Sequence, residues 1–307
     1  MPTDADTRSK GAHYLDADHH AVVEFVKAAA LKPGETVLDA GAGRGALTGR
    51  ICDAVAPGGT VVAVETQQDL VFRLKRLAKP GLQVIQGDIL AVRLPVPLDA
   101  VVANPPYRIL PAILRRLLAH GFGRAVLVVP LELAERLVAQ PKSDNYGRLT
   151  IEIAMQAKVE RLFAMPKRAF DPVPAVASVV IRVTPKPGRP MDGIDAKVLD
   201  HVLDAAWDGR TKTLRHALSP LDKVLGVPPQ DISEALAMVN GQERRFTEVS
   251  PWEWSVVAKH LSACTEARKA ARTAVKDARK ESERVARREA DLARAPKADD
   301  VADADLN

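Results

Sequence analysis

Cysteine is scarce in this 307-residue chain, and long apolar runs are missing. Cys52 and Cys264 are too few and too far apart for a disulfide framework or a zinc site, so we expect two free thiols in a reducing compartment. No apolar run reaches the roughly 18 residues that a membrane span needs. The polar first ten residues also lack a hydrophobic signal core. These absences predict a cytoplasmic protein without a membrane span or a metal.

Aromatic residues are also few, at 4% of the chain. This argues against a surface that stacks many unpaired bases, and favours recognition of shape and phosphates together with one specialised pocket. The net charge of +5 favours a polyanionic partner. The length allows one large core plus a smaller domain.

A glycine-rich loop follows the first predicted strand. The run that begins at Thr36 ends in Gly41-Ala42-Gly43-Arg44-Gly45, and a helical pattern continues through Leu47, Ile51 and Val55. Glycines let a ligand approach the backbone closely, and the start of the helix offers unpaired N–H groups. The pattern therefore predicts a binding loop for a nucleotide-like cofactor.

Acidic residues end the next two predicted strands. Thr60–Val64 leads into Glu65, about twenty residues after the last loop glycine, where an acid suits a ribose diol. The run 83–86 is followed by Gly87-Asp88-Ile89. A carboxylate there can accept a hydrogen bond from an adenine amino group, while the next backbone N–H reaches a ring nitrogen.

The tetrapeptide Asn104-Pro105-Pro106-Tyr107 follows the apolar run 98–103. The Asn oxygen and the adjacent carbonyl can accept hydrogen bonds from an exocyclic amine, the Tyr ring can stack on a base, and the prolines stiffen the turn. Taken singly, each of these motifs is more often a plain turn, cap or strand end. Together they lie at successive carboxyl ends of strands, where an open α/β sheet binds ligands.

The order of these motifs resembles the S-adenosylmethionine-dependent adenine-N6 methyltransferases. Further segments resemble the KsgA/Dim-type small-subunit rRNA adenine-N6,N6-dimethyltransferase family, and within it the archaeal branch. The similarity runs from about Gly11 to Leu261 and is carried by residues 123–149, 166–178, 209–215 and 246–254.

The resemblance implies an α/β fold of class I S-adenosylmethionine-dependent methyltransferases, with a Rossmann-like, mainly parallel sheet and a small C-terminal helical domain. We expect the last strands at 149–157, 158–163 and 177–184, with an antiparallel pairing at one edge. The expected organisation is an N-terminal arm and cofactor-covering segment (1–20), a methyltransferase domain (21–185), a helical rRNA-binding domain (191–262) and a charged helical tail that ends in a disordered acidic segment (263–307).

The implied function is transfer of methyl groups from S-adenosyl-L-methionine to N6 of two adjacent adenines in a 3′-terminal loop of small-subunit (16S) rRNA during ribosome biogenesis. The expected partner is this rRNA in a pre-30S-like particle, and we expect a monomer. The residues that the resemblance assigns fall into three groups. They are the catalytic Asn104, Pro105, Tyr107 and Phe170; the cofactor-binding His13, Leu15, Gly41, Ala42, Gly43, Glu65, Thr66, Asp88, Ile89 and Asn104; and the RNA-binding Arg148, Arg210, Lys212 and Arg215.

Several of these assignments have alternatives. Phe170 could stack on the target base or be a core residue, and Tyr14 could contact the cofactor or only pack. The basic residues near 210–215 could bind phosphates or form a solvated face. The same holds for the basic residues of the tail, such as Arg268 and Arg272, which could serve solubility alone.

Two departures from the family pattern concern the substrate. Pro105 stands where the family usually has Leu, and the resulting Asn-Pro-Pro-Tyr sequence is the form usual in DNA adenine-N6 methyltransferases. After Tyr107, Arg108-Ile109-Leu110-Pro111 replaces a polar turn. The alternatives are therefore an adenine-N6 methyltransferase acting on large-subunit rRNA or DNA, and a weakly catalytic ribosome-assembly factor.

Overall fold

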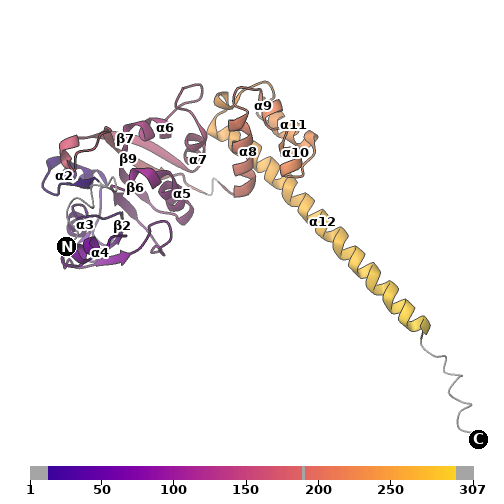
Figure 1. Ribbon diagram of the computed structural model, residues 1–307, viewed down its shortest axis with the longest axis horizontal. Coiled ribbons are helices and arrows are strands. Elements are labelled where there is room, and N and C mark those ends of the chain that lie inside the picture. The colour runs from indigo at the N-terminus through magenta and orange to yellow at the C-terminus, as the bar shows by residue number, and fades with distance from the viewer. Residues whose placement is uncertain (1–12, 189–190, 295–307) are drawn as a thin grey trace, which may run out of the picture.

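A computed structural model describes residues 13–188 and 191–294 of the chain. A sheet covered by helices forms the N-terminal part, a cluster of helices follows, and the long helix α12 (Pro251–Arg294) projects away from both (Figure 1). Residues 1–12 and 295–307 lie outside the described ranges, and with them most of the predicted N-terminal arm and the predicted acidic end. No helix in 13–188 or 191–294 is long and apolar enough to cross a membrane.

The described residues form a seven-stranded sheet in the order β4-β3-β2-β5-β6-β9-β7 and a separate two-stranded pair of β1 (Tyr14–Leu15) with β8 (Phe170–Asp171). The five strands from β4 to β6 are parallel, whereas β9 pairs antiparallel with both β6 and β7. This confirms the predicted mainly parallel sheet with an antiparallel edge. The strands are β2 (Thr36–Ala40), β3 (Thr60–Glu65), β4 (Leu82–Gln86), β5 (Ala100–Ala103), β6 (Arg124–Pro130), β7 (Ala157–Met165) and β9 (Ser178–Pro185).

Helices cover both faces of this sheet, so its central strands are apolar on both sides. Neighbouring strand residues face opposite layers: Val37 belongs to the core cluster that includes α2 and α3, and Leu38 to the cluster that includes α5, α6 and α7. The helices of this part are α2 (His20–Ala28), α3 (Thr48–Val55), α4 (Gln68–Lys75), α5 (Leu110–His120), α6 (Leu131–Leu137) and α7 (Arg148–Gln156), with 3₁₀ turns η1 (Tyr107–Ile109) and η2 (Lys167–Ala169).

The strand predicted at 149–157 is wrong, because this segment is the helix α7. Its apolar residues alternate like those of a strand for a different reason. Leu149 and Ile153 pack into the core beside the sheet, and Ile151 and Met155 pack into the core of the C-terminal helices. Residues four apart share a helix face, so a helix between two cores carries two opposite apolar faces and mimics a period of two.

The C-terminal helices pack around a core of their own, which includes Phe246 and Trp254 with ring centroids 5.5 Å apart. The elements are α8 (Ala196–Asp208), α9 (Leu214–Ala217), α10 (Leu221–Val224), α11 (Pro229–Ala237), η3 (Phe246–Glu248) and the first turns of α12. Tyr146, from the loop before α7, packs against Phe246 with the two ring centroids 6.3 Å apart. The predicted C-terminal helical region is therefore present, and it is joined to the sheet domain through α7 and its preceding loop.

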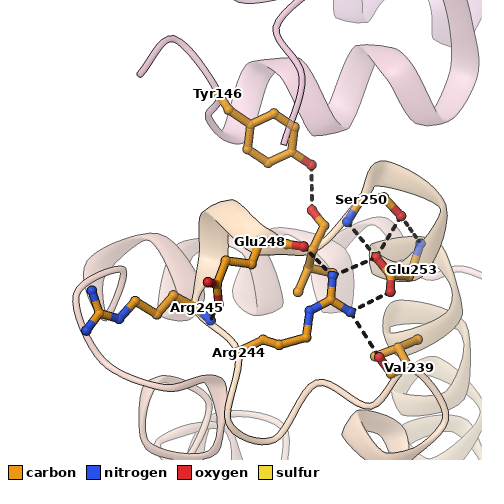
Figure 2. Close-up of polar contacts among 8 residues, drawn as sticks. Tyr146, Val239, Arg244, Arg245, Glu248, Ser250 and Glu253 are labelled. Carbon is orange, nitrogen blue, oxygen red and sulfur yellow. Dashed lines mark hydrogen bonds and ion pairs between the residues drawn. The ribbon is translucent and has the colours of Figure 1, made fainter. Parts of the chain in front are cut away.

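A polar network fixes the start of α12 (Figure 2). Arg244 donates to both carboxylate oxygens of Glu253, and Ser250 donates to the same carboxylate from its backbone N–H and its hydroxyl. The Arg244 hydrogen bond is the main reason that the pKa of Glu253 falls to about 2. The Tyr146 hydroxyl donates to the Val249 carbonyl at 2.7 Å, which extends the network to the sheet domain.

The part of the predicted tail that the structure describes, residues 263–294, is a direct continuation of this anchored helix. Thr265 is buried, and Glu266 to Arg284 are exposed. Three basic residues of this stretch, Lys269, Arg279 and Arg284, pair with acids of the same helix.

Candidate active site

A cavity of about 270 Å³ lies at the carboxyl ends of β2, β3, β4 and β5. It is the edge at which sequence reasoning placed the four motifs. Every residue predicted to bind the cofactor lines this cavity, as do three of the four residues predicted to act on the acceptor base. They are His13, Leu15, Gly41, Ala42, Gly43, Glu65, Thr66, Asp88, Ile89, Asn104, Pro105 and Tyr107.

The glycine loop is tightly enclosed. Gly41 and Gly43 have φ values of +79° and +56°, a region that favours glycine. A Cβ atom on Gly43 would lie 2.9 Å from the Tyr14 ring, and one on Gly41 would lie 3.2 Å from Pro106. The loop therefore needs glycine for its conformation and for the close approach of two other segments.

Glu65 is fixed by the backbone around it. It is 7% exposed; its Oε2 accepts from Gly43 N at 2.9 Å, and its Oε1 accepts from Thr66 N at 2.8 Å and Gln67 N at 3.0 Å. Oε2 retains acceptor capacity, because each carboxylate oxygen can accept about two hydrogen bonds. The carboxylate is thus oriented in advance for a ligand hydroxyl.

Asp39 is a cavity residue that sequence reasoning missed. Its Oδ2 accepts from Thr48 Oγ1 at 2.7 Å, and its Oδ1 is buried with no hydrogen-bond partner in the described part of the chain. Burial raises the pKa of Asp39 from 3.8 to about 7. Its place at the end of β2, two residues before Gly41, was the available signal. An unpaired buried acceptor here fits a donor or cationic group of a ligand.

Asn104 has one polar group engaged and one without a partner. Its Nδ2 donates to the His13 carbonyl at 2.9 Å, and its Oδ1 is buried without a partner among the described residues. Because a carbonyl oxygen only accepts, the amide nitrogen must face His13. Oδ1 is therefore left as the acceptor of this side chain.

Tyr107 is half-buried, and its hydroxyl shares a 2.8 Å hydrogen bond with Ser178 at the start of β9. Burial raises the pKa of Tyr107, so its phenol is neutral near pH 7. Ser178, which sequence reasoning did not select, thus holds the ring at the cavity.

Asp88 is exposed, and its Oδ1 accepts from Leu90 N at 2.8 Å, as a turn residue does.

Phe170 is not among the residues that line the cavity. Its side chain is 3% exposed and packs in the core cluster between the sheet and α2. The structure thus places it as the core residue that sequence reasoning kept as an alternative. A stacking role would require the ring to leave that core.

The predicted RNA-binding residues lie in other elements. Arg148, at the start of α7, pairs with Glu152 on its own helix and with Asp200 and Asp204 on α8, so its guanidinium is already engaged. Arg210, Lys212 and Arg215 are exposed around the α8–α9 connection. Arg210 lies over the Trp207 ring at 5.0 Å, and Arg215 pairs with Glu243 at 2.7 Å.

A family model described as ribosomal RNA adenine dimethylase matches residues 5–244. The chain belongs to this family. The predicted family and the predicted class of enzyme, an S-adenosylmethionine-dependent adenine methyltransferase, are therefore confirmed.

Two curated relatives illustrate the similarity. The "Ribosomal RNA small subunit methyltransferase A" of Thermosynechococcus vestitus is 37% identical over 261 residues, which cover 82% of this chain and 95% of that protein. The "Probable ribosomal RNA small subunit methyltransferase A" of Methanopyrus kandleri, an archaeal relative, is 38% identical over 214 residues, which cover 69% of this chain and 75% of that protein.

Solved structures support the fold. A dimethyladenosine transferase from Plasmodium falciparum superposes with a TM-score of 0.70 at 22% identity, over 80% of this chain and 96% of that one. The 23S rRNA methyltransferase ErmE superposes with a TM-score of 0.58 at 24% identity, over 81% of this chain and 99% of that one. The similarity in both cases includes most of the chain, so the helical region is part of the shared fold.

The cofactor of this rRNA adenine dimethylase family member is S-adenosyl-L-methionine, and the cavity fits it. Gly41 and Gly43 add no side chain to the cavity wall, and Glu65 presents an oriented carboxylate. Asp39 presents a buried acceptor that has no partner among the described residues. These groups match a cofactor that carries hydroxyls and positive charge.

Proposed function

We propose that this protein transfers methyl groups from S-adenosyl-L-methionine to N6 of two adjacent adenines in a 3′-terminal loop of small-subunit rRNA. It acts as a monomer on a pre-30S-like particle in the cytoplasm and needs no metal. The observation that carries the proposal is the Oδ1 of Asn104, which has no partner in the described part of the chain and lies at a cavity lined by all the predicted cofactor residues. The names of the curated relatives support the substrate.

The chemistry concerns a weak nucleophile. The lone pair of adenine N6 is delocalised into the ring, and hydrogen bonds from the amine to Asn104 Oδ1 and the Pro105 carbonyl would favour a more tetrahedral nitrogen. S-adenosyl-L-methionine supplies an already activated methyl group. Asn104 and Pro105 therefore contribute mainly by orientation and charge complementarity, and the released proton can pass to solvent.

The acceptor base is held by Tyr107, whose ring is fixed through its hydrogen bond to Ser178. Stacking on an aromatic ring contributes about 1–3 kcal/mol per base. A base must leave its helical stack to enter such a cavity, so an unpaired loop adenine is a better substrate than a paired one. Exposed Arg210, Lys212 and Arg215 would bind backbone phosphates outside the cavity.

The test uses labelled S-adenosyl-L-methionine with immature small subunits, large-subunit rRNA and DNA in parallel, followed by mass spectrometry of the nucleosides. We expect dimethyladenosine in the small-subunit rRNA. Methylation of only large-subunit rRNA or DNA would contradict the proposed substrate. Tight binding to the small subunit without methyl transfer would indicate an assembly factor.

Asn104→Ala should lower kcat at least 100-fold, since it removes the acceptor that orients the amine. The matched control is Asn145→Ala, because Asn145 is exposed in the loop before α7 and far in sequence from the cavity residues. Its rate should equal that of the unmodified protein. A rate for Asn104→Ala within about threefold of the unmodified protein would refute the proposed role of Asn104.

A further inference from the structure

We propose that the ion pair between Arg44 and Asp171 is a clamp that positions Asn104 for methyl transfer, through the segment His13–Leu15. This segment is called the strap below. Asp171 is a positioning residue: it does not line the cavity, and it acts through the strap. The inference rests on the proposed function, because it concerns the orientation of the same acceptor group.

The strap is held above the glycine loop by a short strand pairing. Its strand β1 (Tyr14–Leu15) pairs antiparallel with β8 (Phe170–Asp171), with Tyr14 opposite Asp171 and Leu15 opposite Phe170. His13 Nδ1 lies 2.9 Å from the Pro172 carbonyl, and Asp16 N donates to the Ala169 carbonyl at 2.9 Å. A two-residue ribbon is marginal by itself, so further contacts must hold it.

The clamp supplies such a contact across the strap. Arg44 extends from the glycine loop and donates to Asp171 Oδ2 at 2.6 Å. The same guanidinium lies 4.5 Å from the centre of the Tyr14 ring. The Tyr14 ring in turn is in contact range of Gly43. Arg44 thus joins the glycine loop, the strap and β8 in one contact group.

The strap also determines how Asn104 is oriented. The His13 carbonyl accepts from Asn104 Nδ2 at 2.9 Å, and this bond selects one of the two orientations of the amide. In that orientation Oδ1 is the unpaired acceptor. If the strap moves away from the glycine loop, the amide loses the partner that defines it. Closure of the strap and readiness of Asn104 are therefore coupled.

Asp171→Asn tests this coupling, since it removes the charge of the clamp with little change of shape. We expect kcat for methyl transfer to fall about tenfold, with the KM for RNA and the melting temperature unchanged. The conservative Asp171→Glu should restore most of the rate. Hydrogen exchange at the strap amides should be faster in Asp171→Asn, a readout that is independent of activity.

Asp53→Asn is the matched control. The Lys79–Asp53 pair has the same 2.6 Å length as the clamp, and its side chains are 35% and 65% exposed, compared with 29% and 67% for Arg44 and Asp171. Asp53 is on α3, and neither Asp53 nor Lys79 lines the cavity. Equal rates and equal strap exchange for Asp53→Asn and Asp171→Asn would overturn the proposal.

A double variant separates the proposed route from others. In an Asn104→Ala background, Asp171→Asn should lower the residual rate no further, because the group that it positions is gone. A second full tenfold loss would mean that the clamp acts by another route and would overturn the inference. The rates of the variants are compared on whichever adenine substrate the unmodified protein methylates. If that substrate is not small-subunit rRNA, the proposed function is refuted, but this comparison of rates still tests the clamp.

Discussion

At the scale of single residues, Asp39 shows most clearly how burial and chemistry are linked. Desolvation raises its pKa from 3.8 to about 7, and within 13–188 and 191–294 only one of its oxygens has a hydrogen-bond partner. A buried carboxyl whose pKa is raised on folding favours the folded state below its unfolded pKa. That stability is lost as the pH rises from about 4 through about 7, where the folded protein must also ionise the group.

Asp39→Asn removes this titration while keeping an oxygen for the Thr48 hydroxyl. Relative to the variant, the unmodified protein should lose stability as the pH rises from 4 to above 7, by at most about 4 kcal/mol. Urea unfolding of both proteins without cofactor at pH 5 and pH 8 measures the part of this loss that falls between those two pH values, at most about 3 kcal/mol. The same difference at both pH values would show that Asp39 does not ionise in this range.

At the scale of elements, α7 connects the two parts of the molecule. Its Glu152 is 6% exposed and accepts from Arg115 on α5 and from Arg148, which also reaches Asp200 and Asp204 on α8. The charge network thus crosses from the sheet domain through α7 to the C-terminal helices. This explains why Arg148, a predicted RNA ligand, has its guanidinium engaged within the protein.

Glu152→Ala should destabilise the protein by about 3 kcal/mol, because it leaves two arginines without their buried partner. Denaturant unfolding measures this loss. Glu283→Ala provides the contrast, since it removes an exposed i,i+4 pair with Arg279 and should change stability by less than about 0.5 kcal/mol. Similar losses for the two variants would mean that burial does not decide the strength of these pairs.

The same helix marks the limit of sequence-based prediction. Alternating Leu149, Ile151, Ile153 and Met155 fit a strand in every local respect, yet two cores on opposite sides make the segment a helix. The parallel strands from Thr36 to Ala103 were predictable, because their apolar runs and terminal turns are local. The second core that redirected 149–156 is built largely from residues beyond 191.

At the scale of the whole molecule, α12 has two different halves. Residues up to Thr265 pack into the helical core, and those from Glu266 to Arg284 are exposed (Figure 1). One of the few contacts of the exposed half outside its own helix is the pair of Arg268 with Asp231. The start of the helix is anchored by the ion pair of Arg244 with Glu253.

A chain that ends at residue 265 should therefore keep its melting temperature within about 3 °C, since the loss of the partly exposed Arg268–Asp231 pair removes about 1 kcal/mol. Differential scanning calorimetry of the full and shortened chains measures this. A fall of 10 °C or more would show that the distal half of α12 contributes to the fold.

Local sequence patterns were enough to predict the parallel strands, the edge of the sheet that holds the cavity and most of the residues around that cavity. Parallel strands bring their carboxyl ends to one side, so motifs that are separate along the chain meet there. The helical state of α7, the burial of Phe170, the partners of Arg148 and the orientation of Asn104 followed only from the folded structure. These depend on contacts between distant segments, such as His13 with Asn104 across 91 positions and Arg44 with Asp171 across 127, which no local pattern encodes.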